Sequence, residues 1–210
     1  MFDKTAFVTF LVAALALNLA PGPDMLYVLG RTLGQGRKAG VVSSLGIFAG
    51  CLAHIAAAAL GVAALLKSSP VAFNVVRYAG AAYLMYLGIR VLASKASALE
   101  NTNAVLKTER LDRIFYQGAI TNVLNPKVAV FFLAFLPQFV NAKSGSVALQ
   151  IVILGLVFNA GGTLVNLIVA SAAGHLGDRL RRAPRIARIQ KWITGTIFIG
   201  LGLRLGLARR

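Results

Sequence analysis

The sequence has few charged residues and very few acids. Of its 210 residues, 13% are charged, and only 6 are Asp or Glu against 22 Lys or Arg. A soluble domain is usually about one quarter charged and about half apolar, whereas this chain is 58% hydrophobic. It therefore cannot cover itself with polar surface, and most of it is predicted to lie in lipid.

The residue types that enzymes and metal sites require are also scarce. The single cysteine, Cys51, permits neither an internal disulfide nor a paired-cysteine redox motif. Two histidines, this cysteine and six scattered acids cannot build a zinc site of the usual spacing. The ATP-binding motif GxxxxGKS or GxxxxGKT is missing, and no Ser, His and Asp arrangement for nucleophilic catalysis can be argued. We therefore expect no enzyme, no bound metal and no cofactor.

The sequence does contain long apolar runs. A helix needs about 20 mostly apolar residues to cross the hydrocarbon core of a bilayer. Three runs carry no charge, and three more carry only one or two isolated charges. The sequence thus predicts an all-α, polytopic membrane protein with six transmembrane helices, at 5–23, 39–66, 71–92, 114–140, 144–177 and 190–208.

The basic residues are distributed unevenly between the loops. The loops after the first, third and fifth spans hold 14 Lys and Arg residues, whereas 7 fall on the other side. Cytoplasmic loops carry an excess of Lys and Arg, so this asymmetry predicts that both termini lie outside the cytoplasm. The net charge of +16 is divided between apolar runs and forms no single patch with aromatics. We therefore expect it to face anionic membrane lipid and not nucleic acid.

The two halves of the chain resemble each other. Residues 77–90, RYAGAAYLMYLGIR, align with residues 191–204, KWITGTIFIGLGLR, and Pro21 has a counterpart in Pro126. Three spans is an odd number, so two copies would cross the membrane in opposite directions, as in many secondary transporters. We predict a single transport domain, 1–210, built from two inverted three-helix repeats at about 1–95 and 114–210 and a polar connector at 94–113.

Each half contains a helix break deep inside an apolar run. Pro21 and Pro126 lie about 15 and about 12 residues into their spans, which is near the bilayer middle at about 1.5 Å per residue. Proline donates no backbone hydrogen bond. Within hydrocarbon such a break is tolerated only where protein or a water-filled cavity surrounds it. We therefore expect the two breaks to face each other and to form a polar pocket.

An ionisable residue follows each break. Asp24 follows the first and Lys127 the second, and ionisable groups inside a membrane are functional candidates that are usually paired. A carboxylate there can bind an α-amino group or carry a proton, while Lys127 and the freed N–H groups of the half-helices attract a carboxylate. Three alternatives stay open: Asp24 as a cap at the membrane surface, Lys127 reaching to the interface, or the two as a structural ion pair.

Two further spans carry a polar or small-residue face. Asn159 and Asn166 fall on one arc of the fifth span. His54 follows Gly46 and Gly50 on the second, with a spacing that lets helices pack closely. We expect both faces to point away from lipid and to contact other helices. His54 is interpreted as a hydrogen-bonded packing residue, and proton coupling together with Asp24 is the functional alternative.

Four stretches of the sequence resemble one family of transporters. NLAPGPDMLYV at 18–28, GIFAG at 46–50, YAGAAYLMYLGIR at 78–90 and NPKVAVFFLAFLPQFV at 125–140 are similar to signatures of the LysE/RhtB family of amino-acid exporters. The resemblance covers nearly the whole chain. It implies a small bacterial inner-membrane exporter of amino acids or related metabolites, driven by an ion gradient, and it raises a homodimer as the assembly. The motifs do not report the substrate.

The sequence therefore predicts a secondary transporter that exports a small amino acid or amino-acid derivative from the bacterial cytoplasm. One deep acid offers little negative charge for a strongly cationic substrate, so neutral amino acids are favoured. The alternative is an exporter of cations or other small metabolites with the same architecture, and a purely structural protein would leave the breaks unexplained. The predicted substrate-binding residues are Asn18, Pro21, Gly22, Pro23, Asp24, Asn122, Asn125, Pro126, Lys127, Asn159 and Asn166.

Overall fold

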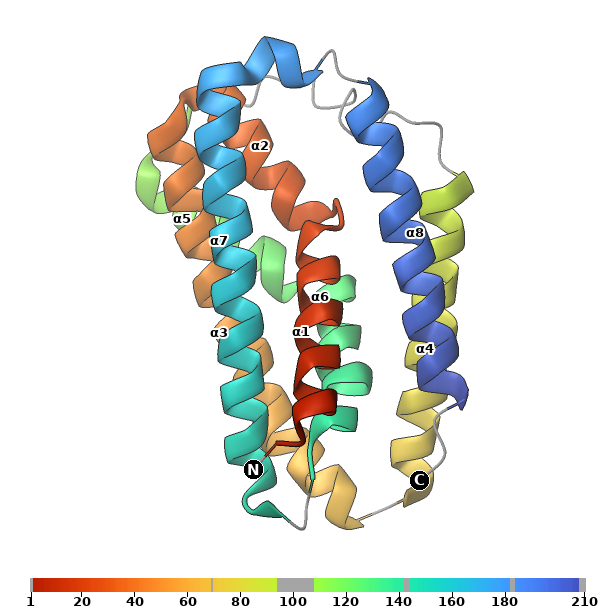
Figure 1. Ribbon diagram of the computed structural model, residues 1–210. Coiled ribbons are helices and arrows are strands. Elements are labelled where there is room, and N and C mark those ends of the chain that lie inside the picture. The colour runs from red at the N-terminus through yellow and green to blue at the C-terminus, as the bar shows by residue number, and fades with distance from the viewer. Residues whose placement is uncertain (1, 69, 94–107, 142–143, 182–183, 208–210) are drawn as a thin grey trace.

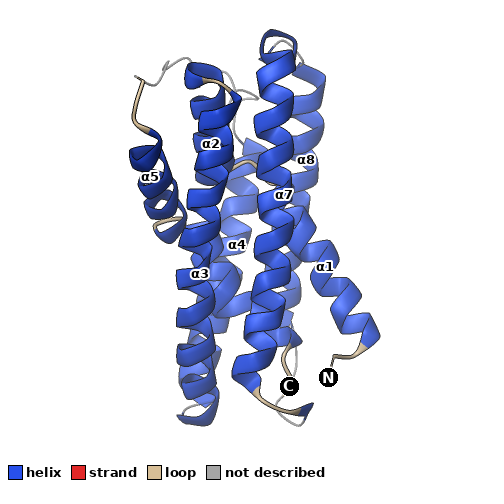
Figure 2. Cartoon of the chain, turned by 90° about the vertical axis from the view of Figure 1, so that its left-hand side faces the viewer, coloured by secondary structure: helices blue, strands red, loops and turns tan. Residues whose placement is uncertain are grey.

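Helices make up nearly all of the described chain. The computed structural model describes residues 2–68, 70–93, 108–141, 144–181 and 184–207. These ranges contain no strand, which confirms the all-α prediction (Figure 2). The helical elements in chain order are α1 (Lys4–Leu19), α2 (Pro23–Gln35), α3 (Arg37–Ser68), α4 (Pro70–Ala93), α5 (Leu111–Val123), α6 (Pro126–Val130), η2 (Phe131–Phe135), η3 (Leu136–Phe139), α7 (Val147–Arg181) and α8 (Pro184–Leu207).

The two halves of the chain have the same order of elements. Each half begins with a bent pair of segments, continues with a long helix and ends with a 24-residue helix that starts at a proline, Pro70 or Pro184. Corresponding helices run in opposite directions, as α3 and α7 or α4 and α8 show, and α1 begins at the end where α8 finishes (Figure 1). Residues 94–107 of the predicted connector lie outside the described residues.

Two to four candidate membrane spans can be identified from length and composition within the described residues. Residues Arg37–Gly61 of α3 and Val147–Ala173 of α7 are each long and apolar enough alone. The pair α1–α2 and the pair formed by α5 with α6 to η3 qualify when each is taken as one span, and they bend by 45° and 46°. The helices α4 and α8, which we expect to be the third and sixth spans, are not among them. Six spans therefore stay a prediction.

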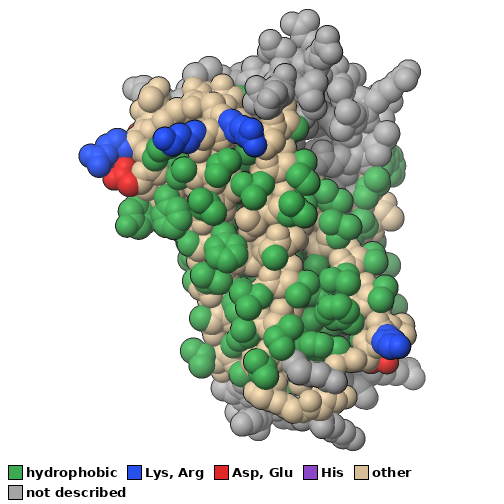
Figure 3. Space-filling model, turned by 60° about the vertical axis from the view of Figure 1, so that its left-hand side comes forward, with side chains coloured by type: hydrophobic (Ala, Val, Ile, Leu, Met, Phe, Trp, Pro, Cys, Tyr) green, Lys and Arg blue, Asp and Glu red, His purple; other side chains and the backbone are tan. Residues whose placement is uncertain are grey.

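The outside of the molecule is apolar over most of its length. Large side chains such as Leu60, Leu124 and Leu164 are exposed. Figure 3 shows hydrophobic side chains spread over the middle of one face, with Lys and Arg towards the ends. So many outward apolar side chains fit a lipid environment and would be unusual on a soluble monomer.

Aromatic rings fill the interior beside α1. Phe10 lies 5.5 Å from Phe139 and 6.1 Å from Phe131 between ring centres. Phe131 stacks on Phe158 of α7 at 4.4 Å. Phe131 and Phe139 lie on the segment after α6, the first on a π-helical turn, η2, and the second on a 3-10 turn, η3. Pro137 lacks the N–H that a regular α-helix would need there, so the helix cannot keep a constant winding.

Glycines let α3 and α5 approach closely. A Cβ added to Gly46 would overlap the backbone of Phe115, and one added to Gly50 would overlap the backbone of Ala119. The predicted helix contact of these two glycines is therefore confirmed. Gly61, further along α3, has nothing within 4 Å of an added Cβ.

Replacing Gly46 by Ala is expected to destabilise the folded protein by about 1–3 kcal/mol, because the added methyl group forces two backbones apart. Gly61→Ala is the matched control on the same helix. Alanine there meets open space and should be neutral or stabilising by up to about 1 kcal/mol. Thermal unfolding of both variants in detergent measures the difference, and equal midpoints would contradict the α3–α5 packing.

Candidate functional site

The first break separates α1 from α2. In a continuous helix residue 21 would donate to the carbonyl of Leu17, but Pro21 has no N–H. The backbone is extended at Ala20 and at Gly22, and α2 restarts with Pro23, at a position that needs no intrahelical N–H bond. The carbonyls of Leu17 and Ala20 are thereby left without their regular helical donors.

Lys127, from the second break, donates to these carbonyls. Its Nζ lies 3.1 Å from Leu17 O and 3.0 Å from Ala20 O. A cation is also favoured by the partial negative charge at the C-terminus of a helix. Gly22 leaves room for this side chain, since a Cβ there would lie 3.1 Å from Nζ. The two breaks therefore lie against each other, joined by Lys127.

The second break has a similar arrangement with a histidine. Pro126 cannot donate to the carbonyl of Asn122, four residues earlier. That oxygen instead accepts from Asn125 N at 2.9 Å and contacts His54 Nε2 of α3 at 3.0 Å. A carbonyl oxygen only accepts, so Nε2 must carry a proton. The His54 ring also stacks on Phe132, with 5.9 Å between centres. His54 is thus a hydrogen-bonded packing residue in this structure.

Replacing His54 separates this packing role from a proton-relay role. Glutamine can donate to the same carbonyl, so His54→Gln should leave stability close to that of the unaltered protein. His54→Leu should lower it by about 0.5–1.5 kcal/mol, because the Asn122 carbonyl keeps the bond from Asn125 N but loses the one from His54. Thermal unfolding in detergent measures both. If the two variants unfold alike, the hydrogen bond is not what His54 contributes.

The helices that begin after the two breaks, α2 and α6, differ in how their first turns are capped. At α6, Asn125 Oδ1 accepts from the backbone N of Lys127 at 3.0 Å. At α2, the N-cap is Gly22, and no side chain bonds there. The first N–H groups of a helix have no partner within it. The start of α6 is therefore capped by a side chain, whereas the start of α2 is not.

A buried carboxylate and a buried amide join the two halves. Asn122 Nδ2 donates to Asp24 Oδ2 at 2.9 Å, and both side chains are buried. Within the described part of the chain, the other two oxygens, Asp24 Oδ1 and Asn122 Oδ1, have no hydrogen-bond partner. Leaving a buried acceptor unsatisfied costs about 1–3 kcal/mol. Asn125 Nδ2 is a buried donor next to the same carboxylate and also has no partner within hydrogen-bond distance among the described residues, so the two oxygens mark a place where further N–H or O–H donors can bind.

A small cavity of about 30 Å³ lies where the breaks meet α3 and α7. It has room for water but not for an amino acid, because pockets for small molecules measure roughly 300–1,000 Å³. The residues around it come from both breaks and from both long helices. They are Asn18, Ala20, Asp24, Met25, Ile47, Cys51, Asn122, Lys127, Val128, Phe158, Asn159, Gly162, Thr163 and Asn166.

The charged groups of the cavity are complementary to a zwitterion. Asp24 and Lys127 line it together but form no direct ion pair, since the ion pairs seen among the described residues are Arg110–Asp112 and Arg113–Glu109. The described residues also hold no cluster of three or more His, Cys, Asp or Glu. The cavity therefore offers one carboxylate, one ammonium group and several amides.

The structure places the predicted residues in two groups. Asn18, Asp24, Asn122, Lys127, Asn159 and Asn166 line the cavity. Pro21, Gly22, Pro23, Asn125 and Pro126 form the breaks beside it. His54 does not line the cavity, but it contacts Asn122, which does. Two of the amides are held by backbone oxygens, Asn18 by that of Phe158 and Asn159 by that of Phe48, each at 3.1 Å.

Sequence reasoning missed part of the lining. Thr163 could have been found, because it lies one helical turn after Asn159 on the same face of α7. Met25, Ile47 and Cys51 gave no signal, since an apolar residue in an apolar span looks the same whether it faces lipid, a neighbouring helix or a cavity. Their position needed the three-dimensional arrangement.

Comparison with known families agrees with this geometry. The model for LysE type translocators matches residues 15–209, which include both breaks and both long helices. The chain belongs to the LysE type translocator family. The resemblance seen in the motifs around Pro21 and Pro126 is thus confirmed. Translocators of this family are transporters, so this chain is a transporter and not an enzyme.

This translocator is similar to curated relatives over nearly its whole length. It is 29% identical over 197 residues to the leucine efflux protein of Salmonella typhimurium, covering 94% of this chain and 92% of the relative. It is 29% identical over 204 residues to the leucine efflux protein of an Enterobacter species, covering 97% and 96%. It is 31% identical over 207 residues to an uncharacterized membrane protein of Pseudomonas aeruginosa, covering 97% and 96%. No solved structure matches the chain.

Proposed function

We propose that this LysE type translocator exports a neutral amino acid, with leucine as the first candidate, through the cavity at its two helix breaks. The names of the leucine efflux proteins support the substrate class. One observation carries the choice of site: Asp24, with an oxygen unpartnered among the described residues, and Lys127 line the same buried cavity. An amino acid with an uncharged side chain brings one cation and one anion to match them.

The ammonium group of the substrate binds at Asp24. Three N–H donors of an α-ammonium group suit the two unpartnered acceptors, Asp24 Oδ1 and Asn122 Oδ1, which lie on either side of an existing hydrogen bond. A hydrogen bond that involves a charged group contributes about 1.5–3 kcal/mol. The same carboxylate can instead hold a proton, and exchange of the proton for the substrate's ammonium group would couple export to an ion gradient.

The carboxylate of the substrate binds between Lys127 and the start of α2. Lys127 uses two of its three N–H donors on α1 and keeps one. The start of α2 adds the positive end of the helix dipole, and its N-cap residue Gly22 brings no capping side chain. Asn18, Asn159 and Asn166 supply the polar surface around the bound zwitterion.

Export requires the cavity to widen on alternate sides. At about 30 Å³ the cavity cannot hold the substrate. On one side Phe158 belongs both to its lining and to the aromatic cluster with Phe10 and Phe131, which must part for release. The opposite directions of corresponding helices support two inverted repeats, 1–95 and 114–210, within one transport domain of six spans. Rocking of one repeat against the other is how such transporters alternate.

The positions of the basic residues indicate how the protein is oriented in the membrane. Gln35 and Glu109 are hydrogen bonded at 2.9 Å, so the basic loop after α2 and the start of α5 share one end of the molecule. The start of α1 and the end of α8 lie at the other end. We place the chain as a multi-pass protein of the bacterial inner membrane with both termini outside the cytoplasm. Its apolar outside contacts membrane lipid, and a homodimer is the proposed assembly.

An export assay tests the function. Cells that lack other exporters are loaded with leucyl dipeptides, which are hydrolysed inside, and leucine released into the medium is measured with and without this protein. We expect faster release and a lower internal leucine level when the protein is present. If neither leucine nor any other neutral amino acid leaves faster, while lysine or a metabolite without an amino group does, the proposed substrate class is wrong.

A further inference from the structure

The wall of the cavity that α3 contributes is apolar. Ile47 and Cys51 are its two residues from this helix, one turn apart and therefore neighbours on the same face. They are buried, at 5% and 2% exposure. Facing residues from α7 are mostly polar, with Asn159, Thr163 and Asn166 among them. The cavity thus has one wall suited to charged and polar groups and one suited to hydrocarbon.

Met25 extends the apolar wall from α3 to α2. It directly follows Asp24, lines the cavity and is buried. Helices α2 and α3 pack against each other, and Val28 and Ile47 belong to one buried cluster. The apolar wall therefore begins next to the carboxylate that is proposed to bind the ammonium group.

The covalent structure of an amino acid fits a cavity with one polar wall and one apolar wall. Its ammonium group, carboxylate and side chain leave one carbon atom in different directions, so a substrate held by Asp24 and Lys127 must direct its side chain elsewhere. The α7 wall is polar, and burying hydrocarbon against polar groups leaves them unsatisfied. The α3 wall accepts hydrocarbon at a gain of about 0.8 kcal/mol per CH₂ group.

We infer that Ile47 and Cys51 of α3, with Met25 of α2, form the side-chain subsite of this translocator and set its preference for aliphatic amino acids by size. The inference rests on the proposed function. Ile47 and Cys51 close the end of the subsite. Replacing them by smaller residues therefore admits substrates with larger side chains, and replacing them by larger residues admits only substrates with smaller side chains. No acid lies among the three, so the cationic side chain of lysine or arginine is rejected.

Export of alanine, leucine and phenylalanine by three variants tests the subsite. Ile47→Ala should raise the phenylalanine-to-leucine ratio about tenfold, and Cys51→Leu should raise the alanine-to-leucine ratio by a similar factor, because one or two methylene groups in an apolar pocket discriminate by about 10- to 200-fold. Ile55→Ala is the matched control. Ile55 is equally buried on α3, but it packs against Gly155 outside the lining. It should lower the amount of protein without changing either ratio.

Cys51 also reports occupancy directly, because it is the only cysteine of the chain. Purified protein is treated with N-ethylmaleimide in the presence of leucine or, as control, arginine. Leucine should slow labelling at least about fivefold and arginine should not. Suppose that the unaltered protein exports leucine, but leucine does not slow the labelling of Cys51, and Ile47→Ala and Cys51→Leu do not change the export ratios. The subsite is then wrong and the function stands. If no amino acid is exported by the unaltered protein, the proposed function itself is wrong.

Discussion

Replacing Asp24 by Asn is expected to lower leucine export by about 100-fold while leaving the protein folded. The amide keeps the size of the side chain and still accepts from Asn122, so the link between the two halves survives. It loses the negative charge that attracts the ammonium group, and a charge-assisted hydrogen bond contributes about 1.5–3 kcal/mol, which corresponds to roughly 10- to 150-fold. Loss of the proton-carrying group adds to this.

Initial rates of leucine release from dipeptide-loaded cells measure the effect, normalised to the amount of protein in the membrane. Asp112→Asn is the matched control, because it makes the same chemical change at an exposed acid paired with Arg110. It should export like the unaltered protein. Unchanged export by Asp24→Asn would remove the ammonium site from the cavity.

Replacing Lys127 by Met should destabilise the protein and abolish export together. Methionine has similar length but no donor, so the carbonyls of Leu17 and Ala20 lose the hydrogen bonds that close the first break. Leu17 O still accepts from Ala20 N at 3.2 Å, whereas Ala20 O loses its donor from Lys127, and a buried acceptor left unsatisfied costs about 1–3 kcal/mol. The thermal unfolding midpoint in detergent should fall clearly, and any protein that remains folded should not export leucine.

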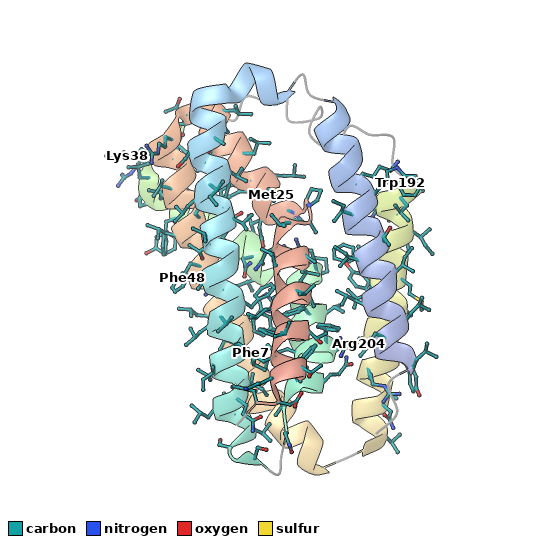
Figure 4. The ribbon with its side chains drawn as sticks, viewed as in Figure 1. Phe7, Met25, Lys38, Phe48, Trp192 and Arg204 are labelled. Atoms are coloured by element: carbon teal, nitrogen blue, oxygen red, sulfur yellow. The ribbon has the colours of Figure 1, made fainter. Side chains whose placement is uncertain are left out.

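The control for Lys127 is the same substitution on the surface. Lys38 lies exposed at the start of α3, so Lys38→Met should leave both the unfolding midpoint and export unchanged. In Figure 4, Lys38 lies at the upper left edge of the molecule, whereas Met25, near the start of α2, lies close to its centre. An unfolding midpoint for Lys127→Met equal to that of the unaltered protein would mean that the two breaks do not depend on each other.

Much of this arrangement can be predicted from the sequence, because proline interrupts the hydrogen bonding of an α-helix whatever residues surround it. Pro21 and Pro126 must interrupt their helices, and interrupted helices in an apolar protein must meet at a polar place. That reasoning predicts the contact of the breaks and the polar residues beside them, such as Asn122 and Asn159. The repeated order of elements also follows from the matching stretches in the two halves.

Other features need the folded chain. The sequence places Lys127 after the second break, but nothing local indicates that its Nζ reaches across to the carbonyl groups of Leu17 and Ala20. The contact of His54 with the Asn122 carbonyl joins residues 68 positions apart. The π-helical turn at Phe131–Phe135 and the apolar wall at Ile47 depend on neighbours from other helices. Pattern alone does not encode such pairings.

Binding of leucine and two truncated analogues to the purified protein tests the central claim most directly. 4-Methylpentanoate lacks the amino group and 3-methylbutylamine lacks the carboxylate. Calorimetric titration should show that leucine binds at least about tenfold more tightly than either, since each loses a charge-assisted hydrogen bond. Asp24→Asn should weaken the binding of leucine and of 3-methylbutylamine but not that of 4-methylpentanoate. If Asp24→Asn weakens all three ligands equally, or none of them, the breaks do not hold the ammonium group as described.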